Sequence, residues 1–169
     1  MNRHLLISSG PITLRSIGEA DLENLRSWKN ANRQAFFFKD EITPEGQRAW
    51  FQSYLGRPND YMFVVEAEGR PVGCMGFRLE PVAADCYNII GAPQGTGRGL
   101  MTHAMKTLCS YILKEHTPRL GCKVLKANPA VGWYQKCGYA IVSDAADYHQ
   151  MNLDPAFKAV EYRIEGGKA

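Results

Sequence analysis

The chain has 169 residues, of which 45% are hydrophobic and 22% charged, as in ordinary globular proteins, so the composition excludes a disordered or fibrous chain. Twenty lysines and arginines against seventeen acidic residues give a net charge of +3, too small to indicate a nucleic-acid partner. No apolar run approaches the roughly 18 residues of a membrane span, and the N-terminus lacks a signal-peptide core. We therefore expect a single domain over residues 1–169 that works in the cytoplasm, without a membrane partner.

The N-terminal segment predicts a strand followed by a helix. Residues 12–15 (Ile-Thr-Leu-Arg) alternate between apolar and polar side chains, which is typical of a strand, and we expect it to be the first one. Ser16 and Glu19 have the spacing of a capping box. The apolar residues that follow recur at three-residue intervals and predict one helical face: Leu22, Leu25 and Trp28.

A second helix and a hairpin come next. Thr43-Pro44 is typical of a helix start, with a hydroxyl cap followed by proline at the first helical position. Three consecutive phenylalanines, residues 36–38, form the connection between the two helices. Residues 61–66 and 72–77 read as strands, joined by the turn at residues 68–71.

The second half of the chain predicts a mixed sheet with two crossovers. A strand near residues 86–90 precedes a glycine-rich loop, and a helix after the loop has apolar residues spaced by four, from Leu100 to Ile112. The remaining expected elements are a strand over residues 122–126, a short helix over 131–137, and strands over 139–142 and 148–153. This order favours an α/β (α+β) fold, a mixed central sheet flanked by helices, over a Rossmann array, and the tail from residue 155 carries no clear pattern.

The cysteines argue against a metal site and a disulfide framework. There are five, an odd number, widely spaced and without a C-x-x-C pair: Cys74, Cys86, Cys109, Cys122 and Cys137. Most have apolar or small neighbours, so we expect buried thiols in a reducing compartment and no bound metal.

The glycine-rich loop, residues 89–100 (Ile-Ile-Gly-Ala-Pro-Gln-Gly-Thr-Gly-Arg-Gly-Leu), is the segment that points to chemistry. Glycines between a strand and a helix let backbone N–H groups approach an anion, and the helix N-terminus adds partial positive charge. A pyrophosphate is a natural ligand, whereas a plain glycine-rich turn is the alternative. The loop lacks the Lys-Ser/Thr of a P-loop and the first βαβ unit of a dinucleotide fold.

This segment resembles the pyrophosphate loop of the GNAT superfamily of N-acyltransferases, which bind acetyl-coenzyme A. Residues 94–99 (Gln-Gly-Thr-Gly-Arg-Gly) match the family pattern Gln/Arg-x-x-Gly-x-Gly/Ala. In a second register, residues 97–104 resemble the helix start of the ribosomal-protein and amino-sugar acetyltransferases of that superfamily. In both registers the resemblance implies that backbone amides of residues 95–101 hold the pyrophosphate.

Two further segments resemble the same family. Residues 25–30 (Leu-Arg-Ser-Trp-Lys-Asn), with residues 42–51, are similar to the opening of the amino-sugar branch. Residues 126–139 resemble the family's Asn … Tyr-x-x-x-Gly-Phe segment, with one residue fewer than usual between Asn128 and Tyr134. The resemblance covers residues 12–153 and implies the acyl-CoA N-acyltransferase fold.

The resemblance also implies roles for individual residues. Tyr134 is the expected proton donor to the departing thiolate, against the alternative of a half-buried aromatic side chain. Asp85 is the preferred general base, with Glu80 and His103 as alternatives that could equally be solvated surface groups. The residues expected to bind acetyl-CoA are Ile89, Ile90, Gly91, Gln94, Gly95, Thr96, Gly97, Arg98, Gly99, Leu100, Met101 and Asn128.

The function that the resemblance implies is transfer of an acetyl group from acetyl-CoA to a primary amine. The leading acceptor is a small-molecule amine such as an amino sugar or a nucleotide-linked amino sugar, for which residues 36–38 and Trp50 could form a stacking platform or simply contribute to the core. An acetyltransferase for protein N-termini and a catalytically silent acyl-CoA-binding module are the alternatives. A homodimer is compatible with the resemblance.

Overall fold

The computed structural model describes residues 4–95 and 97–166. Over these residues the helices are α1 (Leu22–Ala31), α2 (Pro44–Leu55), α3 (Leu100–Glu115) and α4 (Val131–Lys136). The strands are β1 (Leu6–Ser9), β2 (Ile12–Ser16), β3 (Asp60–Ala67), β4 (Arg70–Leu79), β5 (Ala84–Gly91), β6 (Leu120–Leu125), β7 (Tyr139–Asp144), β8 (Tyr148–Leu153) and β9 (Arg163–Glu165).

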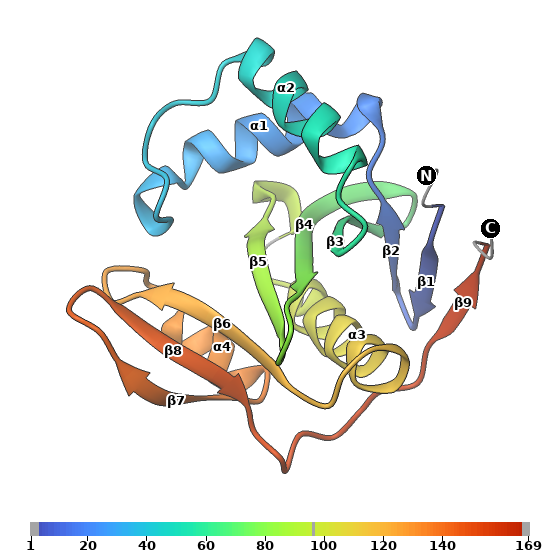
Figure 1. Cartoon of the computed structure of the whole chain (residues 1–169). Coiled ribbons are helices and arrows are strands. Elements are labelled where there is room, and N and C mark those ends of the chain that lie inside the picture. The colour runs from blue at the N-terminus through green and yellow to red at the C-terminus, as the bar shows by residue number, and fades with distance from the viewer. Residues whose placement is uncertain (1–3, 96, 167–169) are drawn as a thin grey trace.

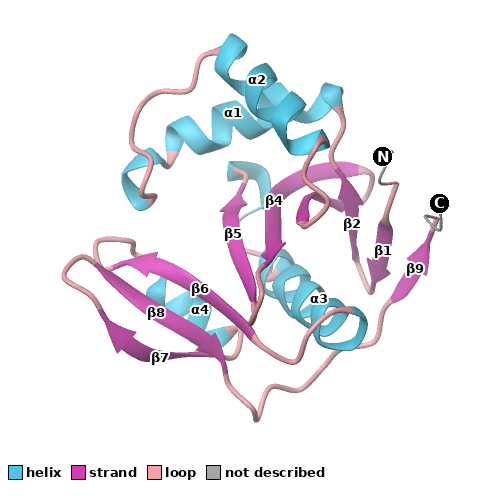
Figure 2. Ribbon diagram, in the orientation of Figure 1, coloured by secondary structure: helices cyan, strands magenta, loops and turns pink. Residues whose placement is uncertain are grey.

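All these strands join one sheet in the order β7-β8-β6-β5-β4-β3-β2-β1-β9. The β5–β6 pair is parallel, and the other neighbours are antiparallel. Helices α1 and α2 cover one face of the sheet, whereas α3 and α4 lie on the other (Figure 1, Figure 2). The predicted mixed sheet with flanking helices is confirmed.

The N-terminal predictions need two corrections. The strand at residues 12–15 is the second strand and not the first, because β1 precedes it and pairs with it in a hairpin. The Ser16–Glu19 capping box is also wrong, since the Ser16 hydroxyl is used by the backbone of Leu5. Asp21 instead accepts a hydrogen bond from the backbone N–H of Gly18, at 2.8 Å, ahead of α1.

The C-terminal tail extends the sheet rather than leaving it. Strand β9 pairs with β1, so the two ends of the described chain lie side by side (Figure 1). The Ser9 hydroxyl donates to the carbonyl of Glu161 at 2.6 Å, and the backbone N–H of Val160 donates to the Ser110 hydroxyl at 2.9 Å. These bonds hold the segment that crosses α3 before it reaches β9.

Two apolar clusters occupy the two faces of the sheet. The larger one lies on the α3 side, where the predicted spacing by four from Leu100 to Ile112 places the buried stripe of α3 against the strands. The smaller one lies beneath α1 and α2 and includes the predicted face of α1. All five cysteines are buried and free, as predicted.

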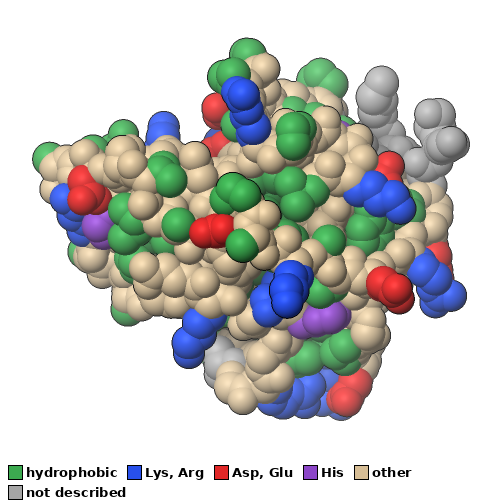
Figure 3. All heavy atoms as spheres, turned by 90° about the horizontal axis from the view of Figure 1, so that it is seen from below, with side chains coloured by type: hydrophobic (Ala, Val, Ile, Leu, Met, Phe, Trp, Pro, Cys, Tyr) green, Lys and Arg blue, Asp and Glu red, His purple; other side chains and the backbone are tan. Residues whose placement is uncertain are grey.

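Among the residues that the structure describes, no helix is both long and apolar enough to cross a bilayer. On the face seen from below, lysines and arginines occur in several separate groups interspersed with acidic and uncharged side chains (Figure 3).

Candidate active site

The sheet opens between β5 and β6. These strands pair at only two positions, Ala84 with Leu120 and Asp85 with Gly121, and then separate. A cavity of about 590 Å³ occupies the opening and extends beneath α1 and α2. Because the strands part, side chains from both faces of the sheet can line one cavity.

Strand β5 carries a bulge at the edge of this opening. Between the pairs Cys74–Ile90 and Gly76–Tyr87, two residues of β5 lie opposite one of β4. Asn88, within the bulge, has a φ of 49°, in the left-handed region. A bulge leaves an extra residue outside the regular ladder, so backbone polar groups of β5 become available to a ligand here.

The three β5 residues predicted to bind the cofactor lie at or just beyond the bulge. Ile89 packs against the α3-side cluster, and Ile90 is buried in the other cluster while lining the cavity. Gly91 pairs with Gly73 of β4, so the strand has regained its register there.

The first part of the predicted pyrophosphate loop is anchored to β4. The Gln94 side-chain amide donates to the carbonyl of Pro71 at 3.1 Å. Gly95 is buried, and a Cβ at this position would lie 2.5 Å from the carbonyl oxygen of Val72, so only glycine fits. Thr96 lies outside the described residues.

The second part of the loop leaves the helix N-terminus open. Gly97 and Gly99 have φ values of 83° and 70°, and a Cβ at either would meet nothing within 4 Å. Gly99 caps α3 without any side-chain hydrogen bond, so the first N–H groups of the helix have no side-chain acceptor there. This geometry suits an anion at the start of α3.

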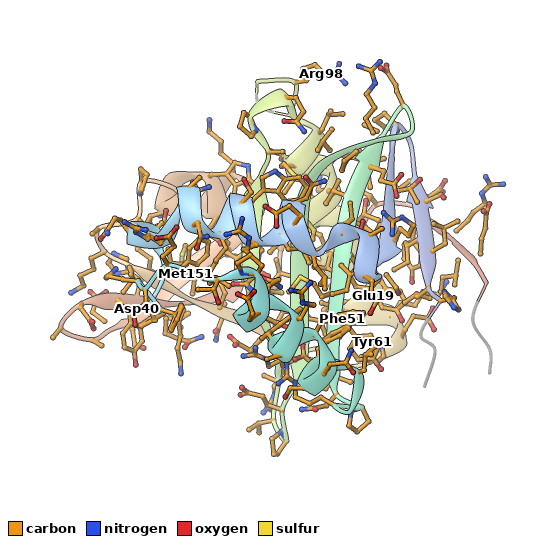
Figure 4. All side chains as sticks on the ribbon, turned by 90° about the horizontal axis from the view of Figure 1, so that it is seen from above. Glu19, Asp40, Phe51, Tyr61, Arg98 and Met151 are labelled. Carbon is orange, nitrogen blue, oxygen red and sulfur yellow. The ribbon has the colours of Figure 1, made fainter. Side chains whose placement is uncertain are left out.

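The side chains around this helix start have different surroundings. Leu100 is buried in the core, whereas Met101 is half-buried and lies where a Cβ on Gly73 would contact it. Arg98 is exposed and stands at the periphery of the molecule (Figure 4). Any contact of Leu100 and Met101 with a pyrophosphate would therefore be made by their backbone N–H groups.

Tyr134 reaches the cavity from α4, on the α3 side of the sheet. It is 7% exposed and packs edge-on against Trp133 and Tyr139. Burial, followed by the neighbouring thiols of Cys122 and Cys86, raises the pKa of the Tyr134 phenol well above 10. The phenol therefore keeps its proton at neutral pH, as a proton donor must.

Asp85 reaches the same cavity from the side of α1 and α2. Burial, and then repulsion from Glu80, raise the pKa of its carboxyl group to about 6, so the group is mainly ionised at neutral pH. Glu80 itself is exposed and does not line the cavity. His103 lies elsewhere, with its Nε2 3.0 Å from the Ser9 hydroxyl. Of these three candidates, only Asp85 shares a cavity with Tyr134.

Asn128 lines the cavity from the loop after β6. Its side-chain oxygen accepts from the backbone N–H of Ala130 at 2.9 Å, and its amide donates to the carbonyl of Ala35 at 3.4 Å. It thereby connects the turn before α4 with the segment after α1.

Aromatic side chains form much of the wall beneath α1 and α2. The predicted platform residue Phe36 is half-buried, and Phe37 and Phe38 are each 54% exposed, so the three do not form a core. Trp50 of α2 stacks on Tyr54 at a centroid distance of 5.2 Å. Tyr87 of β5 also lines the cavity, a position that the sequence analysis did not single out.

An ionic cluster supports this wall. Asp60 is fully buried and forms salt bridges with Arg57 at 2.9 Å and with Arg78 at 3.4 Å. The Tyr87 hydroxyl donates a hydrogen bond to the same carboxylate, and the Arg78 guanidinium lies 3.8 Å from the Tyr87 ring centroid. No local pattern announces this cluster, because its members come from three separate strands and the end of α2.

Comparison with known proteins identifies the class. The model of the acetyltransferase (GNAT) family matches residues 23–139, more than half of the chain. The chain therefore belongs to that family and is an acetyl-CoA-dependent N-acetyltransferase. No curated protein sequence matches the chain.

Solved structures with the same fold include enzymes with different acceptors. Spermidine N-acetyltransferase from Vibrio cholerae, in complex with CoA and spermine, is 19% identical, with a TM-score of 0.74 over 85% of this chain and 95% of that chain. Apo FdhC, a nucleotide-linked sugar GNAT, is 14% identical, with a TM-score of 0.76 over 89% of this chain and 90% of that chain. At these identities the likeness extends to the fold and leaves the acceptor open.

Proposed function

We propose that this enzyme acetylates the primary amine of a small molecule, with an amino sugar or a nucleotide-linked amino sugar as the leading acceptor class. The observation that carries the proposal is the single cavity that combines Asp85, Tyr134 and the β5 bulge with an aromatic wall. Aromatic rings stack on the faces of sugars and nucleobases, so Phe36 and Trp50 are suited to hold such an acceptor.

The residues around the cavity fit acetyl-CoA. The backbone of Ile89–Gly91, at the bulge, would bind the pantetheine arm and polarise the thioester carbonyl. The loop of Gly95, Gly97 and Gly99 and the open start of α3 would hold the pyrophosphate, because unblocked N–H groups and the helix dipole favour an anion. When bound, acetyl-CoA supplies the acetyl group as a reactive thioester. Asn128 would line the route between the site for the pantetheine arm and the site for the pyrophosphate.

The chemical roles follow from protonation states. The Asp85 carboxylate would accept a proton from the acceptor's ammonium group, directly or through a water molecule, so that the amine becomes nucleophilic. The Tyr134 hydroxyl would donate its proton to the departing sulfur, and the second proton released by the acylated nitrogen would then restore the phenol. Both groups have the required state at neutral pH. Burial raises the pKa of Tyr134 well above 10, so the phenol is protonated, whereas the pKa of Asp85 rises only to about 6, so its carboxyl group is ionised.

The proposal is tested by an acceptor panel with wild-type enzyme and Tyr134→Phe. The panel contains amino sugars, UDP-linked amino sugars, polyamines and N-terminal peptides. We expect acetylation of an amino-sugar acceptor, with kcat falling about 10²–10⁴-fold in Tyr134→Phe and little change in the affinity for acetyl-CoA. Tyr162→Phe is the matched control, since Tyr162 lies on the tail and not in the cavity.

Each alternative predicts its own outcome. Unchanged turnover in Tyr134→Phe would remove Tyr134 from the chemistry. Acetylation of peptides alone would make the enzyme an N-terminal protein acetyltransferase. Binding of acetyl-CoA without acetylation of any amine would favour the acyl-CoA-binding module.

A further inference from the structure

The part of the cavity beneath α1 and α2, where the acceptor is proposed to bind, contains a lysine without an acidic partner. Lys29 of α1 lines the cavity; its ammonium donates to the side-chain oxygen of Asn88 and lies 3.6 Å from the ring centroid of Phe36. Across residues 4–95 and 97–166, no carboxylate forms a salt bridge with it. Burial, with a smaller contribution from the neighbouring Arg78 cation, lowers the pKa of Lys29 to about 8.

The nearest ionic cluster does not supply the missing negative charge. Arg57 and Arg78 share the single carboxylate of Asp60, whose remaining contact is the hydroxyl of Tyr87. Lys29 interacts electrostatically with Arg78 and therefore places a third cation near a cluster that contains one carboxylate. An ammonium removed from water without a counter-ion is unfavourable, and a ligand anion would offset that cost.

The other charged groups around the cavity leave this imbalance in place. Asp85, mainly ionised at neutral pH, adds a second carboxylate, but this carboxylate already interacts with the two cations Lys123 and Arg78. Lys123 is exposed and adds positive charge. Glu41 lines the cavity as an exposed residue, so water screens its charge.

A second polar side chain of the same cavity comes from α2. Gln47 of α2 is only 7% exposed and lines the same cavity. Its side-chain amide takes part in no hydrogen bond among the described residues, and its polar atoms are not fully buried, so solvent in the cavity reaches them. An amide that faces the cavity without a protein partner can donate to and accept from a polar group of an acceptor that enters there.

We propose that Lys29 and Gln47 form an anion subsite that binds a phosphate or carboxylate group of the acceptor, with Arg78 adding to the positive potential. This inference rests on the proposed function and narrows its substrate class to amines that carry an anionic group, such as phosphorylated or nucleotide-linked amino sugars. The same potential opposes a polyamine, because a polycation would meet Lys29 and Arg78.

Direct binding tests the subsite without any turnover. Isothermal titration is done with glucose 6-phosphate and UDP-glucose, which lack an amine, and with neutral glucose as the reference. The protein is saturated with CoA so that the pyrophosphate loop is already filled. We expect at least one anionic probe to bind more tightly than glucose, with affinity reduced at least tenfold in Lys29→Met and largely retained in Lys29→Arg. Lys158→Met, at an exposed tail lysine, is the matched control and should bind as the wild type does.

Kinetics separates failure of the subsite from failure of the proposed function. We expect kcat/KM for glucosamine 6-phosphate or UDP-glucosamine to exceed that for glucosamine, and the ratio to fall at least tenfold in Lys29→Met. Anion binding that depends on Lys29, without acetylation of any amine, would support the subsite and overturn the acceptor assignment. Equal use of neutral and anionic amines, unaffected by Lys29→Met, would overturn the subsite while leaving the N-acetyltransferase function intact.

Discussion

Tyr134 and Asp85 approach the cavity from opposite faces of the sheet. Tyr134 belongs to α4 and lies within the larger apolar cluster, whereas Asp85 belongs to β5 and faces the side of α1 and α2. In the proposed mechanism, Tyr134 serves the departing sulfur and Asp85 the attacking amine, the two groups bonded to the reacting carbon in the tetrahedral intermediate. The arrangement is suited to direct transfer between the two substrates.

The pH dependence of activity tests the role of Asp85. Its pKa of about 6 means that the carboxylate form is lost as the pH falls through 6. We expect kcat/KM to decline about tenfold per pH unit below that value, and Asp85→Asn to abolish this limb while lowering the rate about 10²–10⁴-fold. A pH–rate profile of both proteins from pH 5 to 9 provides the measurement.

Stability of the same variant provides the control for misfolding. The folded-state pKa of Asp85, about 6, is above its ordinary value of 3.8, so between these two pH values the folded state binds more protons than the unfolded state. The contribution of Asp85 to stability is therefore present at low pH and lost as the pH rises through about 6. Asp85→Asn should unfold at no lower temperature than the wild type at pH 7. A large loss of stability there would make its low activity uninformative about the base.

At the level of elements, α2 is positioned by its N-cap and carries part of the acceptor wall. The Thr43 hydroxyl accepts from the backbone N–H of Gly46 at 3.0 Å, and Pro44 occupies the first helical position, as predicted. Gln47 and Trp50 then project from α2 into the cavity. The cap therefore stabilises the helix that holds Gln47 and Trp50 in the cavity wall.

Removing this cap should have a small and defined effect. We expect Thr43→Ala to cost about 1 kcal/mol of unfolding free energy, which corresponds to a fall of roughly 2–4 °C in Tm, and Thr43→Ser to restore most of it. Thermal denaturation followed by circular dichroism measures both. The affinity for acetyl-CoA should stay the same, because the pyrophosphate loop is a separate element. An unchanged Tm in Thr43→Ala would mean that tertiary contacts alone hold α2.

Strand β5 combines three structural features over a short length. It begins with the parallel pair to β6, then carries the bulge at Asn88, and leads into the glycine loop. Close packing against β4 requires glycine at position 73, where a Cβ would lie 2.5 Å from the carbonyl oxygen of Ile90. The opening of the sheet and the expected thioester site therefore depend on the same strand.

On the scale of the whole molecule, the proposed cofactor site joins the two halves of the sheet. Strands β5 and β6 pair only at Ala84 and Asp85 of β5. The part of the sheet formed by β6, β7 and β8 is therefore connected to the rest through few backbone bonds and through the α3-side cluster. A ligand that fills the opening should therefore stabilise the fold as a whole.

Thermal shift measures this coupling. With acetyl-CoA at 100 times its Kd, we expect stabilisation by about 2.7 kcal/mol. For a chain of this length that corresponds to an increase of roughly 5–10 °C in Tm. Adenosine at the same concentration is the control, because it lacks the pyrophosphate and the pantetheine arm. The absence of any shift at saturating acetyl-CoA would contradict the placement of the cofactor in this opening.

Local patterns predicted most of the elements but missed both strands nearest the termini. The spacing of Leu22, Leu25 and Trp28 identified α1, and the apolar stripe of α3 was equally clear. Strands β1 and β9 have four and three residues, too few for a periodicity. Strand β1 forms because it pairs with β2 and β9, and β9 forms because it pairs with β1. The predicted cap at Ser16 failed for a similar reason, since a distant backbone group at Leu5 uses its hydroxyl.

The candidate site also contains some residues that the sequence predicts and others that only the structure shows. Tyr134 and the glycine loop stand out in the sequence, because a resemblance to known motifs depends on neighbouring residues only. The salt bridges of Asp60, and the absence of a carboxylate partner for Lys29 among the described residues, depend on which distant segments are adjacent. They therefore could not be predicted. The same holds for the choice of Asp85 over Glu80, which rests on burial in the cavity.

The sequence by itself determined the order and type of the main elements, the acetyltransferase family and the loop expected to bind the cofactor. These properties arise from short-range spacing of apolar residues, glycines and a tyrosine, which the chain carries whether or not it is folded. Only the tertiary structure decided where β5 and β6 separate, which side chains meet in the resulting cavity, and which of the buried charges lack a partner. Burial and charge pairing depend on contacts between distant segments, and the proposed preference for an anionic amine rests on these contacts.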